Sequence, residues 1–329
     1  MFKQLFNEAT ITLSIEPEGP ILIKASESGA DPTRPDMEFV RTIYQGRETI
    51  YLPGSSLKGV IRAHCERLAR TVQPERVAAD LSECRLSCDP LDDKLSCWHK
   101  WEEEKKRRKQ ESAPSAQEIY RESCFVCRLF GNTSLASRLR VTDAYPNDLD
   151  EVKTEERNGV AIDRVFGSVA HGPFQYEVAV QGTFVCRLHV RNFTIAQLGL
   201  MALALRDLEM QRVGVGFAKS RGLGRVRARV NRVFFRYPAC TLDGTLKLVG
   251  SNKPGTSPTQ LTGAGVFAPD RDYGLEEADT AALPDGVTLI ADDWGEPIVD
   301  LTDDAKIKAL WRECVAAWRR VVEKVVGQG

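Results

Sequence analysis

Alternating apolar and polar residues predict β-strands in the first three quarters of the chain. Residues 8–16 place Ile11, Leu13 and Ile15 on one face and hydroxyl-bearing side chains on the other. Residues 184–191 repeat this period of two. Because successive side chains of a strand point to opposite faces, both segments are typical of half-buried strands.

Apolar residues spaced three and four apart predict three helices. The first begins after Pro53-Gly54-Ser55-Ser56, where proline and glycine break the chain and serine can cap a helix. The second follows Thr194, and the third follows Asp303 or Asp304. Up to Tyr237 the elements run strand, helix, hairpin, helix, strand, which predicts an α+β fold of the ferredoxin-like (RRM-like) type with additions.

Residues 73–127 interrupt this order and are interpreted as an insertion. They have few periodic apolar positions and several cysteines, and residues 102–109 are a run of charges. Glutamates ahead of lysines and arginines at a spacing of four favour a solvated helix for this run, with RNA contact as the alternative.

Composition excludes some classes of protein. The 329 residues are 42% hydrophobic and 28% charged. No window approaches the roughly 18 consecutive apolar residues of a membrane-spanning helix, so we expect no membrane partner. The start of the chain lacks the apolar region of an export signal, so we expect a cytoplasmic location. Nine cysteines in a reducing compartment favour metal ligation or buried thiols over disulfides.

The net charge of -1 conceals a strong asymmetry. Residues 268–304 hold twelve acidic side chains and one basic one, so the remainder has 44 basic and 34 acidic residues, a balance of +10. Residues 211–236 contain eight lysines and arginines and no acid. That density suits contacts with phosphates, and a solvated strand edge is the alternative.

Five of the nine cysteines cluster within residues 84–127. Cys124-x-x-Cys127 with two upstream thiolates can complete a tetrahedral zinc site. The preferred ligands are Cys88, Cys97, Cys124 and Cys127, with Cys84 and His99 as alternatives. Four protein ligands leave no position for water, so the zinc is expected to be structural. The remaining cysteines lie on apolar faces and are expected in the core; they are Cys65, Cys186, Cys240 and Cys314.

Residues 214–224 form a glycine-rich segment that also carries Lys219 and Arg221. Glycines let a phosphate backbone approach closely, and the two cations supply charge. The segment is neither a Walker loop nor a dinucleotide fingerprint, because the residue order differs and no helix is predicted after it. Taken alone, this motif is compatible with a phosphate-binding loop and with an ordinary glycine-rich turn.

Three blocks together resemble the RAMP (repeat-associated mysterious protein) superfamily, and within it the backbone subunits of type III CRISPR effector complexes. They are P-G-S-S-L-K-G-x-x-R at 53–62, C-x-x-C-R-L-F-G at 124–131 and G-x-G-x-x-K-S-R-G-L-G-R at 214–225. The likeness covers roughly residues 8–236. It implies a ferredoxin-like palm at 1–72 and 128–240, a thumb hairpin at about 159–176 that wedges into the guide–target duplex, and a zinc-containing finger insertion at 73–127. Residues 241–329 lie mostly outside it.

The resemblance also implies partners, which are guide CRISPR RNA, complementary target RNA and other CRISPR complex subunits. A helix N-terminus presents free N–H groups and a positive dipole end, so the 53–62 block is a sensible phosphate site. The residues expected to contact RNA are Ser55, Ser56, Lys58, Arg62, Arg164, Lys219, Arg221 and Arg225.

Family members that cut target RNA carry an aspartate ahead of the 53–62 block, followed by a basic residue. Asp36, with Arg41 after it, matches best, and Asp31 is the second candidate. The ribose 2'-hydroxyl would attack its own phosphate while Mg²⁺ or another divalent metal shields charge. Metal ligation suits Asp36 better than a role as general base, because an exposed aspartate has a pKa near 4. The alternatives are a non-catalytic RNA-binding subunit and a zinc-stabilised assembly protein with an acidic protein partner.

The acidic stretch 268–304 has two physically open uses. It can dock on the basic face of a neighbouring subunit, or it can shield the RNA groove of its own chain. Docking is favoured because an apolar anchor accompanies the charges, formed by Trp294, Ile298, Val299 and Leu301.

Overall fold

An antiparallel sheet of seven strands forms the centre of the described part of the chain. The computed structural model describes residues 3–25, 35–73, 85–107, 114–268 and 273–327. The spatial order is β14-β15-β9-β1-β8-β4, and β5 also pairs with β8. The strands are β1 (Glu8–Pro17), β4 (Leu139–Val141), β5 (Tyr145–Pro146), β8 (Phe184–Arg191), β9 (Val226–Arg236), β14 (Ile290–Ala291) and β15 (Pro297–Leu301). The predicted α+β class with antiparallel pairing is confirmed.

The two alternating segments become the middle of this sheet. Ile11 of β1 lies opposite Leu188 of β8, and both side chains are fully buried. The hydroxyl-bearing Thr10 and Thr12 of β1 are half-buried on the other face. The period of two therefore predicted correctly which face of each strand is buried.

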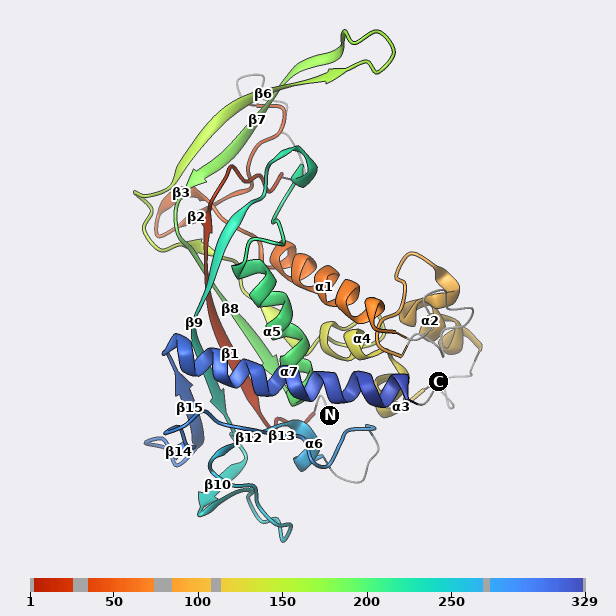
Figure 1. Ribbon diagram of the computed structural model, residues 1–329, viewed down its shortest axis with the longest axis vertical. Helices are drawn as coiled ribbons and strands as arrows, with labels where there is room; N and C mark the ends of the chain where they lie inside the picture. Colours follow the sequence, from red (N-terminus) through yellow and green to blue (C-terminus); the bar gives the residue numbers. More distant parts are fainter. Residues whose placement is uncertain (1–2, 26–34, 74–84, 108–113, 269–272, 328–329) are drawn as a thin grey trace.

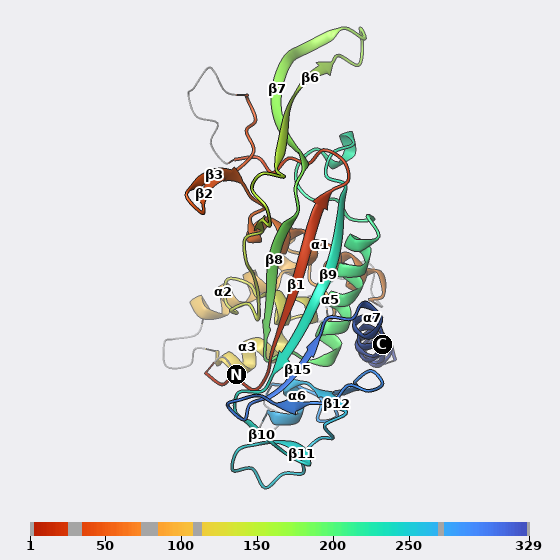
Figure 2. The ribbon, with the colours of Figure 1, turned by 90° about the vertical axis from the view of Figure 1, so that its left-hand side faces the viewer.

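Three long helices cover one face of the sheet. They are α1 (Gly54–Thr71), α5 (Ile195–Glu209) and α7 (Asp304–Val326). Figure 1 shows them on one side of the strands, and Figure 2 shows β8, β1 and β9 in front of them. Two predicted helix starts are confirmed, since Thr194 forms a capping box with Gln197 and the carboxylate of Asp303 accepts from the Lys306 N–H.

Helix α5 lies between the sheet and α7. Twelve of its fifteen residues are buried, because the sheet covers one side and α7 the other. At the crossing of the two helices a Cβ on Gly199 would lie 2.0 Å from the carbonyl oxygen of Cys314. Only glycine fits this contact, so the sequence itself fixes how closely α7 packs.

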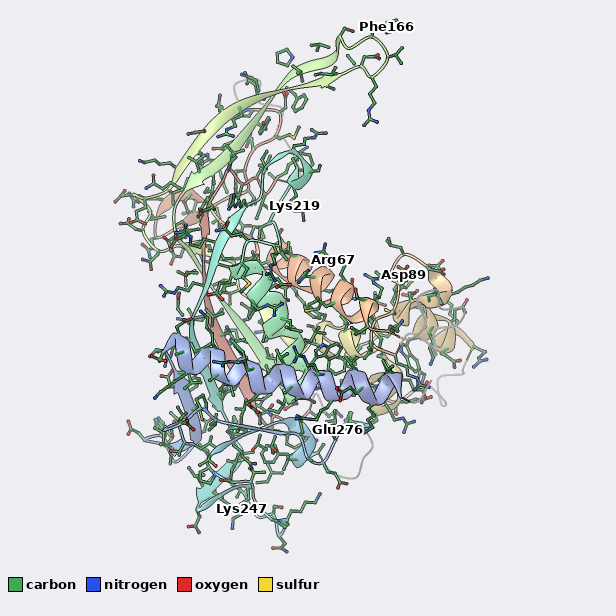
Figure 3. The ribbon with its side chains drawn as sticks, in the orientation of Figure 1. Arg67, Asp89, Phe166, Lys219, Lys247 and Glu276 are labelled. Carbon is green, nitrogen blue, oxygen red and sulfur yellow. The ribbon has the colours of Figure 1, made fainter. Side chains whose placement is uncertain are left out.

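A long hairpin projects from one end of the sheet. It pairs β6 (Lys153–Ile162) with β7 (Val169–Gln181), and a smaller hairpin of β2 (Arg41–Tyr44) and β3 (Arg47–Ile50) lies near its base. Figure 1 shows the long hairpin arching over the side of the sheet that carries the helices. It contains the range 159–176 and extends beyond both ends of that range. At its tip Val165 is 82% and Phe166 is 85% exposed (Figure 3).

The insertion between α1 and β4 contains short helices. They are the 3-10 helix η2 (Asp93–Leu95), α2 (Cys97–Arg107), α3 (Ala116–Glu122) and α4 (Phe125–Phe130). Helix α4 packs against α1. The described part of the charge run, up to Arg107, is helical as predicted.

The C-terminal part corrects the expectation for the acidic stretch. Its elements are β10 (Cys240–Asp243), β11 (Thr245–Leu248), β12 (Gln260–Thr262), α6 (Ala264–Phe267), β13 (Thr280–Ala282), β14, β15 and α7. Strand β15 extends the central sheet by pairing with β9, and Val299 and Leu301 are buried in this chain's own core. Most of the anchor proposed for a neighbour is thus used internally, while Trp294 remains 92% exposed.

Carboxylates of the same stretch bind partners within the chain. Both oxygens of Asp300 accept from Arg232 of β9, at 2.7 and 2.6 Å. The buried carboxylate of Asp279 accepts from the N–H groups of Ile195, at 2.8 Å, and Gly265, at 3.1 Å. The acids therefore help to build the fold around α5 and β9, which neither the docking nor the shielding hypothesis anticipated.

Candidate functional site

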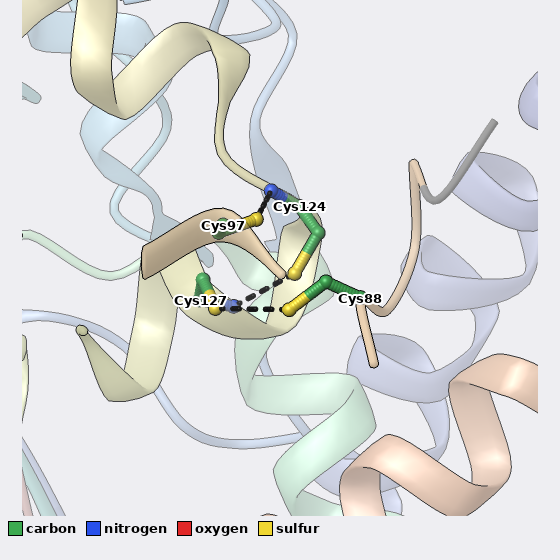
Figure 4. Close-up of side chains that lie close together, drawn as sticks. All are labelled: Cys88, Cys97, Cys124 and Cys127. Atoms are coloured by element: carbon green, nitrogen blue, oxygen red, sulfur yellow. Dashed lines mark hydrogen bonds between the residues drawn. The ribbon is translucent and has the colours of Figure 1, made fainter. Parts of the chain in front are cut away.

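Four buried cysteines of the insertion meet in one cluster (Figure 4). The sulfur atoms of Cys88, Cys97, Cys124 and Cys127 all lie within 4.8 Å of one another. Cys124 precedes α4, and its sulfur accepts from the Cys127 N–H at 3.4 Å, so the C-x-x-C spacing folds both sulfurs to one side. The Cys124 N–H in turn donates to the Cys97 sulfur at 3.3 Å. Four sulfurs at these spacings can hold a metal ion such as zinc.

Of the two alternative ligands, only His99 is among the described residues, and it is not part of the cluster. Cys84 is outside the described residues, and the Nε2 of His99 lies 3.3 Å from a carboxylate oxygen of Glu103. Hydrogen bonds from the thiols of Cys124, Cys127 and Cys97 lower the pKa of Cys88, whereas burial raises the pKa of Cys124. Cys88 is therefore the first of the four to become a thiolate, the form that ligates metals. The other described cysteines are buried in the core as predicted, and burial raises the pKa of Cys186 to about 12.

The start of α1 differs from the predicted serine cap. Pro53 is the N-cap residue and makes no side-chain hydrogen bond. The Gly54 N–H instead donates to a carboxylate oxygen of Asp143 at 2.7 Å. Ser55 is exposed and Ser56 is half-buried. A carboxylate thus occupies part of the predicted phosphate site, and nothing near residue 54 in the sequence signals it.

Two basic residues of α1 have partners inside the protein. Arg62 donates from Nε to Glu66 at 2.8 Å and from Nη1 to the Gly131 carbonyl at 3.1 Å, and its Nη2 lies 3.8 Å from the Cys127 sulfur. Lys58 Nζ donates to a serine hydroxyl at 2.8 Å, and burial lowers its pKa. Arg62 therefore connects α1 to the cysteine cluster.

The glycine-rich segment presents its cations to solvent. Lys219 and Arg221 are exposed on η4 (Lys219–Arg221), a 3-10 turn that follows Ala218 in the left-handed conformation. Gly216 has φ +89°, and a Cβ there would lie 2.2 Å from the Leu22 carbonyl oxygen. The segment is therefore pressed onto residues 20–24 and leads directly into β9.

The glycine-rich segment, the long hairpin and residues 35–40 meet at a pocket of 190 Å³. Its lining includes Met37, Phe174, Tyr176, Phe217 and Arg221. The neighbouring Asp36 is exposed, and its Oδ2 accepts from the Gln175 N–H of β7 at 2.8 Å. The middle of the hairpin thus brings the first catalytic candidate near a predicted RNA contact, Arg221.

The remaining predicted residues are spread more widely. Asp31 lies outside the described residues, and Arg41 forms an ion pair with Glu177. Arg164 is exposed near the tip of the hairpin. Arg225 is exposed and donates to Gln211 at 2.6 Å.

Sequence reasoning missed a cluster of charges between α1 and α5. It consists of His64, Arg67, Arg206, Asp207 and Arg212. Its members come from two helices and the following segment, so no local motif connects them. The available signal was the helical spacing of the apolar residues after residue 53, which leaves Arg67 on the opposite, polar side of α1.

A family model for the RAMP superfamily matches residues 15–227. The chain belongs to the RAMP superfamily. Among curated proteins, no sequence matches it. The RAMP match runs from β1 into the start of β9 and includes the cysteine cluster, both hairpins and the glycine-rich segment. RAMP membership indicates a CRISPR-associated RNA-binding subunit. In the described part of the chain, no helix has the length and apolar character needed to span a bilayer.

Proposed function

We propose that this RAMP protein is a guide-RNA-binding backbone subunit of a type III CRISPR complex in the cytoplasm. The sheet order β9-β1-β8-β4, with α1 and α5 on one face, supports a ferredoxin-like palm. The β6–β7 hairpin with its exposed apolar tip supports a thumb that wedges into a guide–target duplex. The four-cysteine cluster supports a finger held by structural zinc.

One observation carries this proposal, namely the exposed cations of the glycine-rich segment beside the middle of the hairpin. Lys219 and Arg221 extend from a backbone held rigidly against residues 20–24. A positive, closely approachable loop beside the hairpin suits the phosphates of a single strand. Phosphate contacts carry no base information, so binding is expected to tolerate any sequence.

The test is binding of a single-stranded RNA oligonucleotide as salt rises from 50 to 200 mM. Wild type should lose affinity steeply, and Lys219→Ala or Arg221→Ala should reduce the slope of log affinity against log salt by about 0.7 per lost contact. Arg319→Ala, an exposed arginine of α7, is the matched control and should behave as wild type. Salt-independent binding would reject the proposal. Nucleic-acid-free material that instead binds an acidic protein would favour the assembly-protein alternative.

Target cleavage is the second candidate function, favoured by the exposed Asp36 beside the middle of the hairpin. The Gln175 N–H orients one carboxylate oxygen, and the other, which no described residue binds, could take a divalent metal such as Mg²⁺. Such a metal would shield the phosphate during attack by the 2'-hydroxyl. In the assembled complex, Asp36→Ala should abolish cleavage of target RNA and leave RNA binding intact, whereas Asp243→Ala, an exposed control, should do neither. Full cleavage by Asp36→Ala would support the non-catalytic alternative or Asp31.

A further inference from the structure

The contact between α1 and α5 contains a carboxylate surrounded by cations. Asp207 is buried, and one of its oxygens lies 2.8 Å from His64 Nε2. The other oxygen lies 2.9 Å from Arg206 and 3.2 Å from Arg212. Arg67, one turn from His64, lies 3.2 Å from His64 Nδ1. We call these five residues the α1–α5 cluster.

The α1–α5 cluster has more positive charge than its carboxylate can neutralise. Three guanidinium groups and one carboxylate leave a surplus of two charges even with a neutral imidazole. Burial alone would raise the pKa of Asp207, but hydrogen bonds from His64 and Arg206 outweigh it and the pKa is lowered. The carboxylate is therefore ionised at neutral pH. A single cation would be enough to neutralise its charge, so the other cations of the cluster are additional.

Stability does not explain the additional arginines. The side chains of Arg206 and Arg212 are 46% and 60% exposed, so solvent screening weakens what each adds to the pairing of Asp207. Asp207 instead fixes where both guanidinium groups lie while leaving most of their donors open to solvent. Oriented, exposed guanidinium groups suit bidentate recognition of phosphate.

The α1–α5 cluster is continuous with the glycine-rich segment. Arg212 lies two residues before that segment, and the adjacent Gln211 accepts from Arg225 just beyond its other end, at 2.6 Å. Figure 3 shows Arg67 on the edge of α1 that faces Lys219 and the overhanging hairpin. One strand can therefore contact both groups of cations.

We propose that the α1–α5 cluster is a second phosphate-binding site for the same RNA strand. Arg67, Arg206 and Arg212 bind the backbone phosphates next to those held by Lys219 and Arg221. The assignment rests on the proposed RNA-binding function, and it extends the path of the strand from the glycine-rich segment along α1.

The experiment measures binding of a uridine oligonucleotide across a salt series with the full chain. Arg67→Ala, Arg206→Ala and Arg212→Ala should each weaken binding several-fold and reduce the salt slope by about 0.7, and Arg67→Ala/Arg212→Ala by about twice that. Arg319→Ala is the matched control. Because all three arginines are exposed, the variants should melt as wild type does, and the melting curve is recorded for each.

The outcomes separate this inference from the proposed function. If wild type binds no RNA, both fail. If Lys219→Ala weakens binding and the three arginine variants match wild type, RNA binding stands and the second site is rejected. If these variants bind RNA normally but fail to assemble with other complex subunits, the cluster faces a protein instead, and that too rejects the site.

Discussion

At the scale of single residues, side chains with the predicted chemistry often have a different partner from the one expected. Arg62 was predicted to hold a phosphate, yet it contacts Glu66, Gly131 and a cysteine ligand candidate. The spacing of the 53–62 block placed it correctly on α1. It could not show that the chain returns with Gly131 and Cys127 some 65 residues later, because such contacts depend on the tertiary fold.

Asp279 has the most consequential titration. Burial raises its pKa to about 7, whereas the unfolded chain has a value near 4. Between these values the folded state binds a proton that the unfolded state does not, so stability contributed by this group falls as pH rises from about 4 to 7.

Asp279→Asn should flatten that part of the pH dependence, measured as the free energy of unfolding in urea at pH 5, 6, 7 and 8. The difference amounts to a few kcal/mol at most, since one pKa unit corresponds to about 1.4 kcal/mol. Asparagine keeps one acceptor for the Ile195 N–H, so the variant should still fold. Asp285→Asn, an exposed control in the same stretch, should keep the wild-type slope. If the free energy of unfolding has the same slope against pH in wild type and in Asp279→Asn, the raised pKa of Asp279 is refuted.

At the scale of elements, periodicity and caps located much of the structure. The central strands, α5 and α7 follow from patterns of two and of three to four residues, and Thr194 and Asp303 mark two helix starts. The cap of α1 was missed because its carboxylate comes from Asp143, on a loop after β4. The C-x-x-C motif located two of the four cysteines in the cluster. Cys88 and Cys97 were the preferred ligands upstream, but only the fold of the insertion shows that His99 is not beside them.

Two glycines of α1 provide a matched pair. A Cβ on Gly54 would lie 2.3 Å from the Val141 carbonyl oxygen, while one on Gly59 would meet nothing within 4 Å. Gly54→Ala should therefore destabilise the protein by about 2 kcal/mol or more through a backbone clash. Gly59→Ala should stabilise it by up to about 1 kcal/mol, because alanine favours a helix interior. Urea denaturation distinguishes the two, and equal effects would mean that α1 does not approach β4 this closely.

The cysteine cluster should bind one zinc ion per chain. Cys124→Ser should lose that zinc and lower the melting temperature, because metal binding is coupled to folding of the insertion. Cys240→Ser, a buried cysteine outside the cluster, should retain full zinc content whatever its effect on stability. The measurement is elemental analysis of protein purified without chelator. Zinc-free wild type with an unchanged melting curve on added zinc would rule the site out.

At the scale of the whole molecule, the C-terminal part completes the fold rather than standing apart from it. Strand β15 covers the edge of β9, and α7 covers α5. Charge counting identified residues 268–304 as unusual but could not show their partners, because β9 supplies Arg232 from more than 60 residues earlier.

Deleting residues 268–304 should therefore leave an insoluble or unfolded chain. The deletion removes Asp279 and β15 and uncovers the edge of the central sheet. Soluble yield and far-ultraviolet circular dichroism measure the effect. Trp294→Ala, in the same stretch but 92% exposed, should change the free energy of unfolding by no more than about 0.5 kcal/mol. A soluble deletion variant with the wild-type melting curve would show that the acidic stretch is dispensable.

The close crossing of α5 and α7 at Gly199 and Cys314 also has a consequence for synthesis on the ribosome. Most residues of α5 are apolar and buried, yet the helix that covers its outer side ends only at Val326. Until the residues up to Val326 have been translated, the nascent chain has an uncovered apolar helix and an open sheet edge. Such surfaces bind chaperones or aggregate, so the rate at which β15 and α7 are made sets how long the nascent chain depends on protection in the cell.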